Sequence, residues 1–147
     1  MIDADLELVL VERFPGDSSI GFVPAYKFQM VRAIQEAPEG QQEELGEIHL
    51  RVGDTERLHL YFGHIGYKVV RQHRGHRYAS RSIKLLFPLM RSHGMETVWI
   101  TCDPANLASR RTCELAGAEP IEVVDLPEDT DLYQRGHRLG CRYRLIL

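Results

Sequence analysis

Apolar and polar residues alternate over several short runs of the chain, and this two-residue period predicts β-strands. The expected strands cover residues 6–11, 45–52, 58–62, 63–70, 97–102, 121–126 and 139–147. The second and third runs are separated by the turn residues Gly53-Asp54-Thr55-Glu56. We therefore expect these two runs to form a β-hairpin.

Three other segments carry apolar residues three and four apart, which is the spacing of an amphipathic helix. These expected helices cover residues 24–35, 79–90 and 107–116. Pro88 lies inside the second helix and is expected to kink it. Asn106 is a favourable N-cap for the third helix, and Gly117 follows its end. The polar segments 37–44 and 127–136 are expected to be loops.

The order of these elements predicts a single α/β domain over residues 1–147, with helices packed around a mixed sheet. The 147 residues, 44% of them hydrophobic, are enough for one core. No apolar run approaches the ~20 residues of a membrane span, and the first ten residues lack the basic segment of a signal peptide. Three cysteines without CxxC spacing favour reduced thiols. We therefore expect a cytoplasmic protein with no membrane segment.

The segment between the expected strand 63–70 and the expected helix 79–90 is short and basic. It holds Arg71, Arg74 and Arg77, and no acidic residue occurs from position 71 to position 95. A chain that passes from a strand into a helix leaves unpaired N–H groups and the positive end of the helix dipole at one place. Because the whole chain has a net charge of −3, the arginines form a local patch. The sequence therefore predicts a phosphate site in this segment.

Other interpretations of this basic segment are a metal site, a nucleic-acid surface and a solvated helix face. His73 and His76 are three residues apart, but no third metal ligand lies near them in the sequence, so we expect no metal. Tyr78 is the only aromatic residue among the arginines, and the net charge is negative. Both observations argue against nucleic acid, while the solvated helix face stays open.

Two motifs in this region are similar to those of a known family. The run Arg74-Gly75-His76-Arg77-Tyr78-Ala79 matches the first and last defining positions of the signature Gln/Arg-x-x-Gly-x-Gly/Ala, with Arg77 where glycine is usual. The segment from Asn106 to Gly117 is similar to a family helix that opens with asparagine and ends in glycine. On these residues the chain resembles the GCN5-related N-acetyltransferase (GNAT) superfamily, most clearly over residues 63–118.

The resemblance implies a mixed, mostly antiparallel sheet of six to seven strands flanked by helices, with two splayed parallel strands in its centre. It implies that acetyl-coenzyme A binds between those two strands, which end near Val69 and Cys102. The implied cofactor-binding residues are Val69, Val70, Arg71, Arg74, Gly75, His76, Arg77, Tyr78, Ala79 and Asn106. The diphosphate would rest on the N–H groups of residues 75–79. We expect a negative φ at Arg77, because this residue opens a helix.

The activity that the resemblance implies is transfer of an acetyl group from acetyl-coenzyme A to a primary amine, by direct attack in a ternary complex. A general base must take a proton from the amine. His64 is the first candidate, and Glu47 on the neighbouring strand is the second. A structural histidine and a solvated glutamate are the alternatives. The acceptor, a small-molecule or peptide amine, is not identified by the sequence, and homodimer formation stays open.

Cys113 stands at a position where many family members carry a tyrosine that protonates the departing thiolate. Tyr133 or Tyr143 could serve instead, or the thiolate could leave unassisted. Two other functions also stay open. One is a non-catalytic module that binds or senses acetyl-coenzyme A or another acyl-coenzyme A, and the other is a protein that binds nucleic-acid phosphate.

Overall fold

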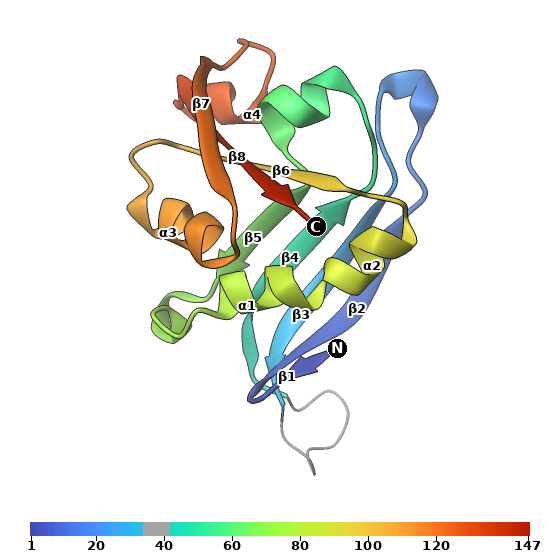
Figure 1. Cartoon of the computed structure of the whole chain (residues 1–147), viewed down its shortest axis with the longest axis vertical. Helices are drawn as coiled ribbons and strands as arrows, with labels where there is room; N and C mark the ends of the chain where they lie inside the picture. Colours follow the sequence, from blue (N-terminus) through green and yellow to red (C-terminus); the bar gives the residue numbers. More distant parts are fainter. Residues whose placement is uncertain (34–41) are drawn as a thin grey trace.

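The strands form two antiparallel sheets in the computed structural model, which describes residues 1–33 and 42–147 (Figure 1). The larger sheet has the order β1 (Ile2–Asp3), β2 (Leu6–Phe14), β3 (Ala25–Arg32), β4 (Glu44–Arg51) and β5 (Ile65–Val69). The smaller sheet has the order β6 (Thr97–Cys102), β8 (Leu139–Ile146) and β7 (Glu119–Asp125). The helices are α1 (Tyr78–Leu85), α2 (Phe87–Ser92), α3 (Leu107–Leu115) and α4 (Asp131–Gln134). A π-helix, η2 (Leu58–Phe62), and two 3₁₀ turns, η1 (Ser18–Ile20) and η3 (Arg71–His73), complete the described elements.

The two sheets meet along β5 and β6, which are edge strands of their own sheets. In Figure 1 the start of β5 lies beside the middle of β6, and the two strands then run in the same general direction and separate toward their C-terminal ends. Where they are close, the His64 N–H donates a hydrogen bond to the Trp99 carbonyl (2.6 Å). Farther along, no ladder joins the two strands in the described part of the chain. The expected α/β fold with two splayed parallel strands is therefore confirmed, but the described strands number eight and form two sheets, where one sheet of six to seven strands was expected.

Helices α1 and α2 cover one face of the larger sheet and pack against its apolar side chains (Figure 1). The buried contacts include Leu8 and Ile48 from the sheet, and Ile83 and Leu86 from the helical side. Each such side chain contributes about 1.5–3 kcal/mol through burial. The break between α1 and α2 falls at Leu86, and Pro88 lies in the first turn of α2. The expected kink is therefore confirmed, because proline is tolerated only where a helix starts.

The expected helix at residues 24–35 is wrong, because this segment forms strand β3 between β2 and β4. Phe28 and Met30, two residues apart, are buried in the core at 4% and 0% exposure. The apolar spacing fitted a short helix, but two neighbouring strands offer this segment a ladder on both sides, and tertiary pairing overrides the local pattern. Residues 34 and 35, and positions 37–41 of the expected loop, lie outside the described residues.

The expected strand at residues 58–62 is also wrong, because these residues form η2. The Thr55 hydroxyl accepts a hydrogen bond from the Leu58 N–H (3.2 Å), which favours the start of a helical turn. Gly63 ends this turn with a φ of 71°. Strand β4 therefore pairs with β3 and β5, and the expected hairpin does not form. The expected loop at 127–136 contains the short helix α4.

Candidate active site

The turn between β5 and α1 presents backbone N–H groups that have no acceptor among the described residues. These are the N–H groups of Gly75, His76, Arg77, Tyr78 and Ala79. No side chain caps the start of α1, and its first turn carries no acidic residue. Bare amides at the positive end of a helix bind anions. The geometry therefore suits the predicted phosphate site.

Arg77 adopts a left-handed conformation, with φ 61° and ψ 24°, so the expected negative φ at this residue is wrong. Gly75, two residues earlier, also has a positive φ, of 90°. A left-handed conformation costs a residue with a side chain about 1–2 kcal/mol. This cost gives a physical reason why glycine is usual at the position of Arg77. The turn keeps its shape here at the expense of local backbone strain.

A cavity of about 490 Å³ lies between this turn, β5 and α3. Arg74, Arg77 and Arg111, all exposed, line one part of it. Tyr67 and Ser109, which are half-buried, line another part. The arginines and the bare amides would bind an anionic group through charge-assisted hydrogen bonds. The cavity therefore fits an elongated ligand that has its negative charge at the exposed end.

The edge of β5 that faces this cavity is free to bind a ligand. The Val70 N–H donates to the Leu45 carbonyl (2.8 Å), so Val70 belongs to the β4–β5 ladder. Because paired residues alternate along an antiparallel ladder, the N–H groups of Tyr67 and Val69 point away from β4, toward β6. The Val69 carbonyl accepts a hydrogen bond from Arg74 Nε (3.2 Å). Of the two predicted valines, Val69 thus lines the cavity, and Val70 supports it from the sheet.

Of the other predicted cofactor residues, Asn106 lines the cavity, whereas Arg71, His76 and Ala79 lie outside its lining. Asn106 lines the cavity, and its side chain caps α3 by accepting from the Ser109 N–H (3.1 Å). Arg71 is exposed in η3 and lies outside the cavity lining. The side chain of Ala79 is buried in α1, so this residue offers only its N–H. His76 is exposed, and its ring lies beside the Tyr78 ring, with 5.6 Å between the ring centroids.

The first turn of α1 is fixed to the N-terminal segment by a network of charged groups. The Tyr78 hydroxyl donates to Asp5 (2.6 Å), and Arg81 donates to Asp5 (2.8 Å) and to Asp3 (2.6 Å). The hydrogen bonds from Tyr78 and then from Arg81 lower the pKa of Asp5 to about 2. This network lies behind the bare amides and holds the helix start in place.

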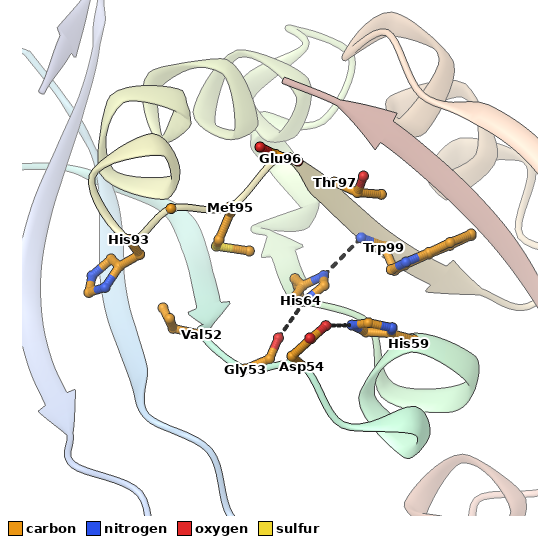
Figure 2. Close-up of a pocket in the computed structure, with 11 residues that line it drawn as sticks. Val52, Gly53, Asp54, His59, His64, His93, Met95, Glu96, Thr97 and Trp99 are labelled. Carbon is orange, nitrogen blue, oxygen red and sulfur yellow. Dashed lines mark hydrogen bonds and ion pairs between the residues drawn. The ribbon is translucent and has the colours of Figure 1, made fainter.

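His64 lies at the start of β5, in the wall of a second cavity of about 450 Å³ (Figure 2). It is 2% exposed. Its Nδ1 accepts from the Trp99 N–H (2.9 Å), and its Nε2 donates to the Gly53 carbonyl (3.0 Å). Burial lowers the pKa of His64, so the ring is neutral. Both ring nitrogens are engaged, which favours the structural alternative, and its role as a base stays a prediction.

Glu47 lies on the polar face of the larger sheet, because the next residue, Ile48, points into the core. Its carboxylate is 3.4 Å from Lys27 Nζ and 3.7 Å from His49 Nε2. Burial lowers the pKa of His49, which favours a neutral imidazole beside this carboxylate. His49 is paired with Gly66 of β5. The sequence analysis missed His49, although its position two residues after Glu47 in a strand puts both on one face.

Cys113, at the position of the family tyrosine, is fully buried in α3. The Tyr67 hydroxyl reaches it from β5 and lies 3.9 Å from its Sγ. Of the tyrosines considered from the sequence, Tyr143 is buried in β8 and its oxygen accepts from Arg110 Nε (3.0 Å). Tyr133 belongs to α4. The structure therefore brings a different tyrosine, from a different element, to the side of Cys113.

Other expectations concern thiols, metals and membranes. Cys102, Cys113 and Cys141 are buried and carry free thiols. His73 lies 2.9 Å from Glu43. Over residues 1–33 and 42–147, no group of three or more His, Cys, Asp or Glu side chains is placed to hold a metal ion. No helix of the described segments is long and apolar enough to cross a membrane.

Solved structures that share this fold include several acetyltransferases. A ribosomal-protein-S5-alanine acetyltransferase from Vibrio fischeri matches with a TM-score of 0.62 and 16% identity, over 83% of this chain and 61% of that one. A ribosomal L7/L12 alpha-N-protein acetyltransferase, in complex with coenzyme A, matches with a TM-score of 0.61 and 16% identity, over 84% and 62%. A spermidine/spermine N-acetyltransferase from Vibrio cholerae matches with a TM-score of 0.56 and 12% identity, over 83% and 65%.

At these identities the structural matches show the fold, and the chain spans a little over three fifths of the length of these proteins. No curated protein matches the sequence significantly. The family profile described as "Acetyltransferase (GNAT) domain" matches residues 16–119, which is more than half of the chain. This segment contains the turn with the bare amides and the separated strands. The chain belongs to the GNAT acetyltransferase family.

Proposed function

We propose that this protein transfers an acetyl group from acetyl-coenzyme A to a primary amine. The observation that carries the proposal is the row of bare N–H groups at residues 75–79, next to a strand edge that is free to bind. An anion site alone would suit many ligands. An anion site continuous with unpaired strand amides suits a ligand that has a diphosphate at one end and amides along its arm.

The residues present fit such a cosubstrate. The diphosphate would lie on the N–H groups of residues 75–79, with Arg74, Arg77 and Arg111 around it. The amides of the arm would pair with the edge of β5, where the N–H groups of Tyr67 and Val69 point away from β4. The cosubstrate would supply the activated acetyl group. The chain would supply binding, orientation and a base.

The reaction needs a site for negative charge on the acetyl oxygen and a base for the amine. The Tyr67 N–H is suited to polarise the acetyl carbonyl, because it is a preorganised donor on the free edge. The amine nitrogen forms a bond to the acetyl carbon, the carbon–sulfur bond breaks, and its electron pair goes to sulfur. We propose that Glu47 and His49 take the proton that the amine loses, since their side chains share the polar face of β4 and lie 3.7 Å apart.

Calorimetry with acetyl-coenzyme A, followed by a panel of amine acceptors, tests the proposal. The panel should contain peptides with free N-terminal amines and small polyamines, because the relatives named above act on ribosomal proteins or on spermidine and spermine. We expect binding of acetyl-coenzyme A and release of coenzyme A only when an amine is present. Absence of acetyl-coenzyme A binding would overturn the proposal.

A second function is favoured by one observation, namely that both ring nitrogens of His64 are engaged. A protein that binds acetyl-coenzyme A without a working base would be a sensor module. Thermal stabilisation by acetyl-coenzyme A, with no turnover on any amine of the panel, would support this function. Turnover that depends on Glu47 or His49 would exclude it.

A further inference from the structure

The hydroxyl of Tyr67 has no role in the function proposed so far. Its side chain extends from β5 to α3, where its oxygen lies 2.6 Å from Ser109 Oγ and 3.9 Å from Cys113 Sγ. It also lies 3.2 Å from the Ser109 carbonyl, to which the hydroxyl can donate. Tyr67 and Ser109 both line the cavity between β5 and α3. A phenol therefore stands in the wall of the cavity, on the residue whose N–H is suited to polarise the acetyl group.

We propose that the Tyr67 hydroxyl donates a hydrogen bond to the sulfur of coenzyme A and stabilises the thiolate as the acetyl group departs. This inference rests on the proposed acetyl transfer and names a further catalytic residue for it. Backbone and side chain of the same residue would then act on two atoms bonded to the same carbonyl carbon, the N–H on the acetyl oxygen and the hydroxyl on the sulfur.

Burial decides which form of the phenol is present. It raises the pKa of Tyr67 above its ordinary value, so the hydroxyl keeps its proton at neutral pH. An ordinary thiol has a pKa of about 8.5, below the value of about 10 for an ordinary phenol. Complete transfer of the proton from Tyr67 to sulfur is therefore unfavourable. Tyr67 acts as a hydrogen-bond donor, the electron pair of the broken bond stays on sulfur, and the thiolate later takes a proton from solvent.

Ser109 allows the phenol to change its hydrogen-bond partner. In the contact between the two hydroxyls, either oxygen can be the donor. If the Ser109 hydroxyl donates to the Tyr67 oxygen, the Tyr67 proton is held only by the longer contact to the Ser109 carbonyl (3.2 Å) and can turn toward a sulfur atom in the cavity. The shared contact then polarises the phenol and strengthens its donation. Tyr143, the other tyrosine that contacts α3, differs because its oxygen accepts from Arg110 Nε (3.0 Å) inside the core.

The inference is testable on the complex with coenzyme A, without knowledge of the acceptor. The ultraviolet absorbance of the thiolate reports the pKa of the bound thiol. The complex with desulfo-coenzyme A is the blank, because it contains the same protein cysteines and lacks only the ligand sulfur. We expect the pKa of the bound thiol to be lower than that of free coenzyme A in the wild-type protein. Tyr67→Phe should raise it by about 1–2, the equivalent of a charge-assisted hydrogen bond.

Two controls make the result specific. Tyr143→Phe removes a buried hydroxyl from the other tyrosine and should leave the pKa of the bound thiol unchanged. Desulfo-coenzyme A should bind wild type and Tyr67→Phe equally within about twofold, because the lost contact is to sulfur alone. Once an acceptor is known, Tyr67→Phe should lower kcat about ten- to a hundredfold with little change in KM.

The outcomes separate this inference from the proposed function. Equal pKa values of the bound thiol in wild type and Tyr67→Phe would overturn the role of Tyr67 and leave acetyl-coenzyme A binding intact. Failure of the wild-type protein to bind coenzyme A would overturn the proposed function itself. If Tyr67→Phe does not fold, fluorotyrosine at position 67 replaces it. This residue keeps the ring and is a stronger donor, so it should lower the pKa of the bound thiol further, and no change would contradict the inference.

Discussion

The two ends of the β5–β6 pair differ in how their polar groups are used. At the start of the strands, His64 is joined to Trp99 and Gly53 through its backbone N–H and both ring nitrogens. At the far end, the amides of residues 75–79 have no acceptor in the described chain. Buried polar groups are normally satisfied within the protein, whereas the exposed residues Gly75, His76 and Arg77 leave their amides available to solvent or to a ligand.

This difference separates an end whose polar groups are paired within the chain from an end whose amides are suited to bind a ligand. The closed end fixes the distance between the two sheets, and the open end can then diverge without loss of the fold. Unpaired strand edges are normally a hazard for proteins. Here the free edge of β5 is short and is bordered by α1 and α3, which limits its access to other chains and leaves it to a narrow ligand.

The largest expected effect is at the closed end. His64→Ala leaves the Trp99 N–H and the Gly53 carbonyl without their partners, which should lower the free energy of unfolding by about 2–5 kcal/mol. Chemical denaturation measures this loss. Glu47→Gln is the matched contrast, because Glu47 is partly exposed, and it should lower turnover with a change in unfolding free energy within about 0.5 kcal/mol. Full stability together with lost turnover in His64→Ala would instead identify His64 as the base.

A second prediction concerns the open end. Arg74→Ala removes a guanidinium from the cavity and should weaken acetyl-coenzyme A binding by about 1–2 kcal/mol. Arg71→Ala is the control, since Arg71 is a nearby arginine outside the cavity lining. It should change the affinity by less than about 0.5 kcal/mol. Calorimetry on both variants checks the contrast, and equal losses would mean that only the general positive charge matters.

A smaller effect is expected from pH. The pKa of His64 is lowered in the folded protein by burial, and its ordinary value is 6.5. The folded state therefore binds fewer protons than the unfolded state. The stability that the neutral, buried His64 ring contributes is fully present above pH ~6.5 and is lost as the pH falls below that value. His64→Asn keeps an acceptor for the Trp99 N–H and does not titrate. The difference in unfolding free energy between wild type and His64→Asn should shrink on acidification, and a constant difference would contradict the assignment.

The smallest effect is expected from Arg77→Gly. Glycine adopts a φ of 61° without strain, so the free energy of unfolding should rise by up to about 1 kcal/mol. The same change removes a guanidinium beside the bare amides and should weaken acetyl-coenzyme A binding. Thermal unfolding and calorimetry on the same sample measure the two effects. A loss of stability would show that the Arg77 side chain makes contacts that outweigh the backbone strain.

The sequence predicted the turn after β5 better than it predicted the segments 24–35 and 58–62. The amides of residues 75–79 and the Asn106 cap depend on local chemistry, a short turn and an N-cap, and local chemistry is visible in a sequence. Strand β3 was mistaken for a helix because a register shift between Met30 and Val31 allows Val31 to be buried as well as Phe28, three residues before it, and this imitates helical spacing. Only the flanking strands β2 and β4 decide between helix and strand, and pairing across the sheet cannot be derived from local spacing.

The side-chain roles were harder to predict than the elements. The sequence offers His64 as a neutral imidazole near the site, but the partners that engage it, Trp99 and Gly53, lie 35 and 11 residues away. Tyr67 reaches Ser109 over 42 residues of sequence. The left-handed conformation of Arg77 was missed because a side chain at that position favours a negative φ. Each of these depends on contacts between distant segments.

The contact of Arg81 with Asp5 spans 76 residues of sequence. The segment from Gly63 to Ala118, which resembles the acetyltransferase family most clearly, is therefore not structurally independent. Transferred alone to another protein, it would lack Asp3 and Asp5, the two carboxylates that hold the first turn of α1. During synthesis, Asp3 and Asp5 leave the ribosome long before Arg81, so the start of α1 and the proposed phosphate site are completed late.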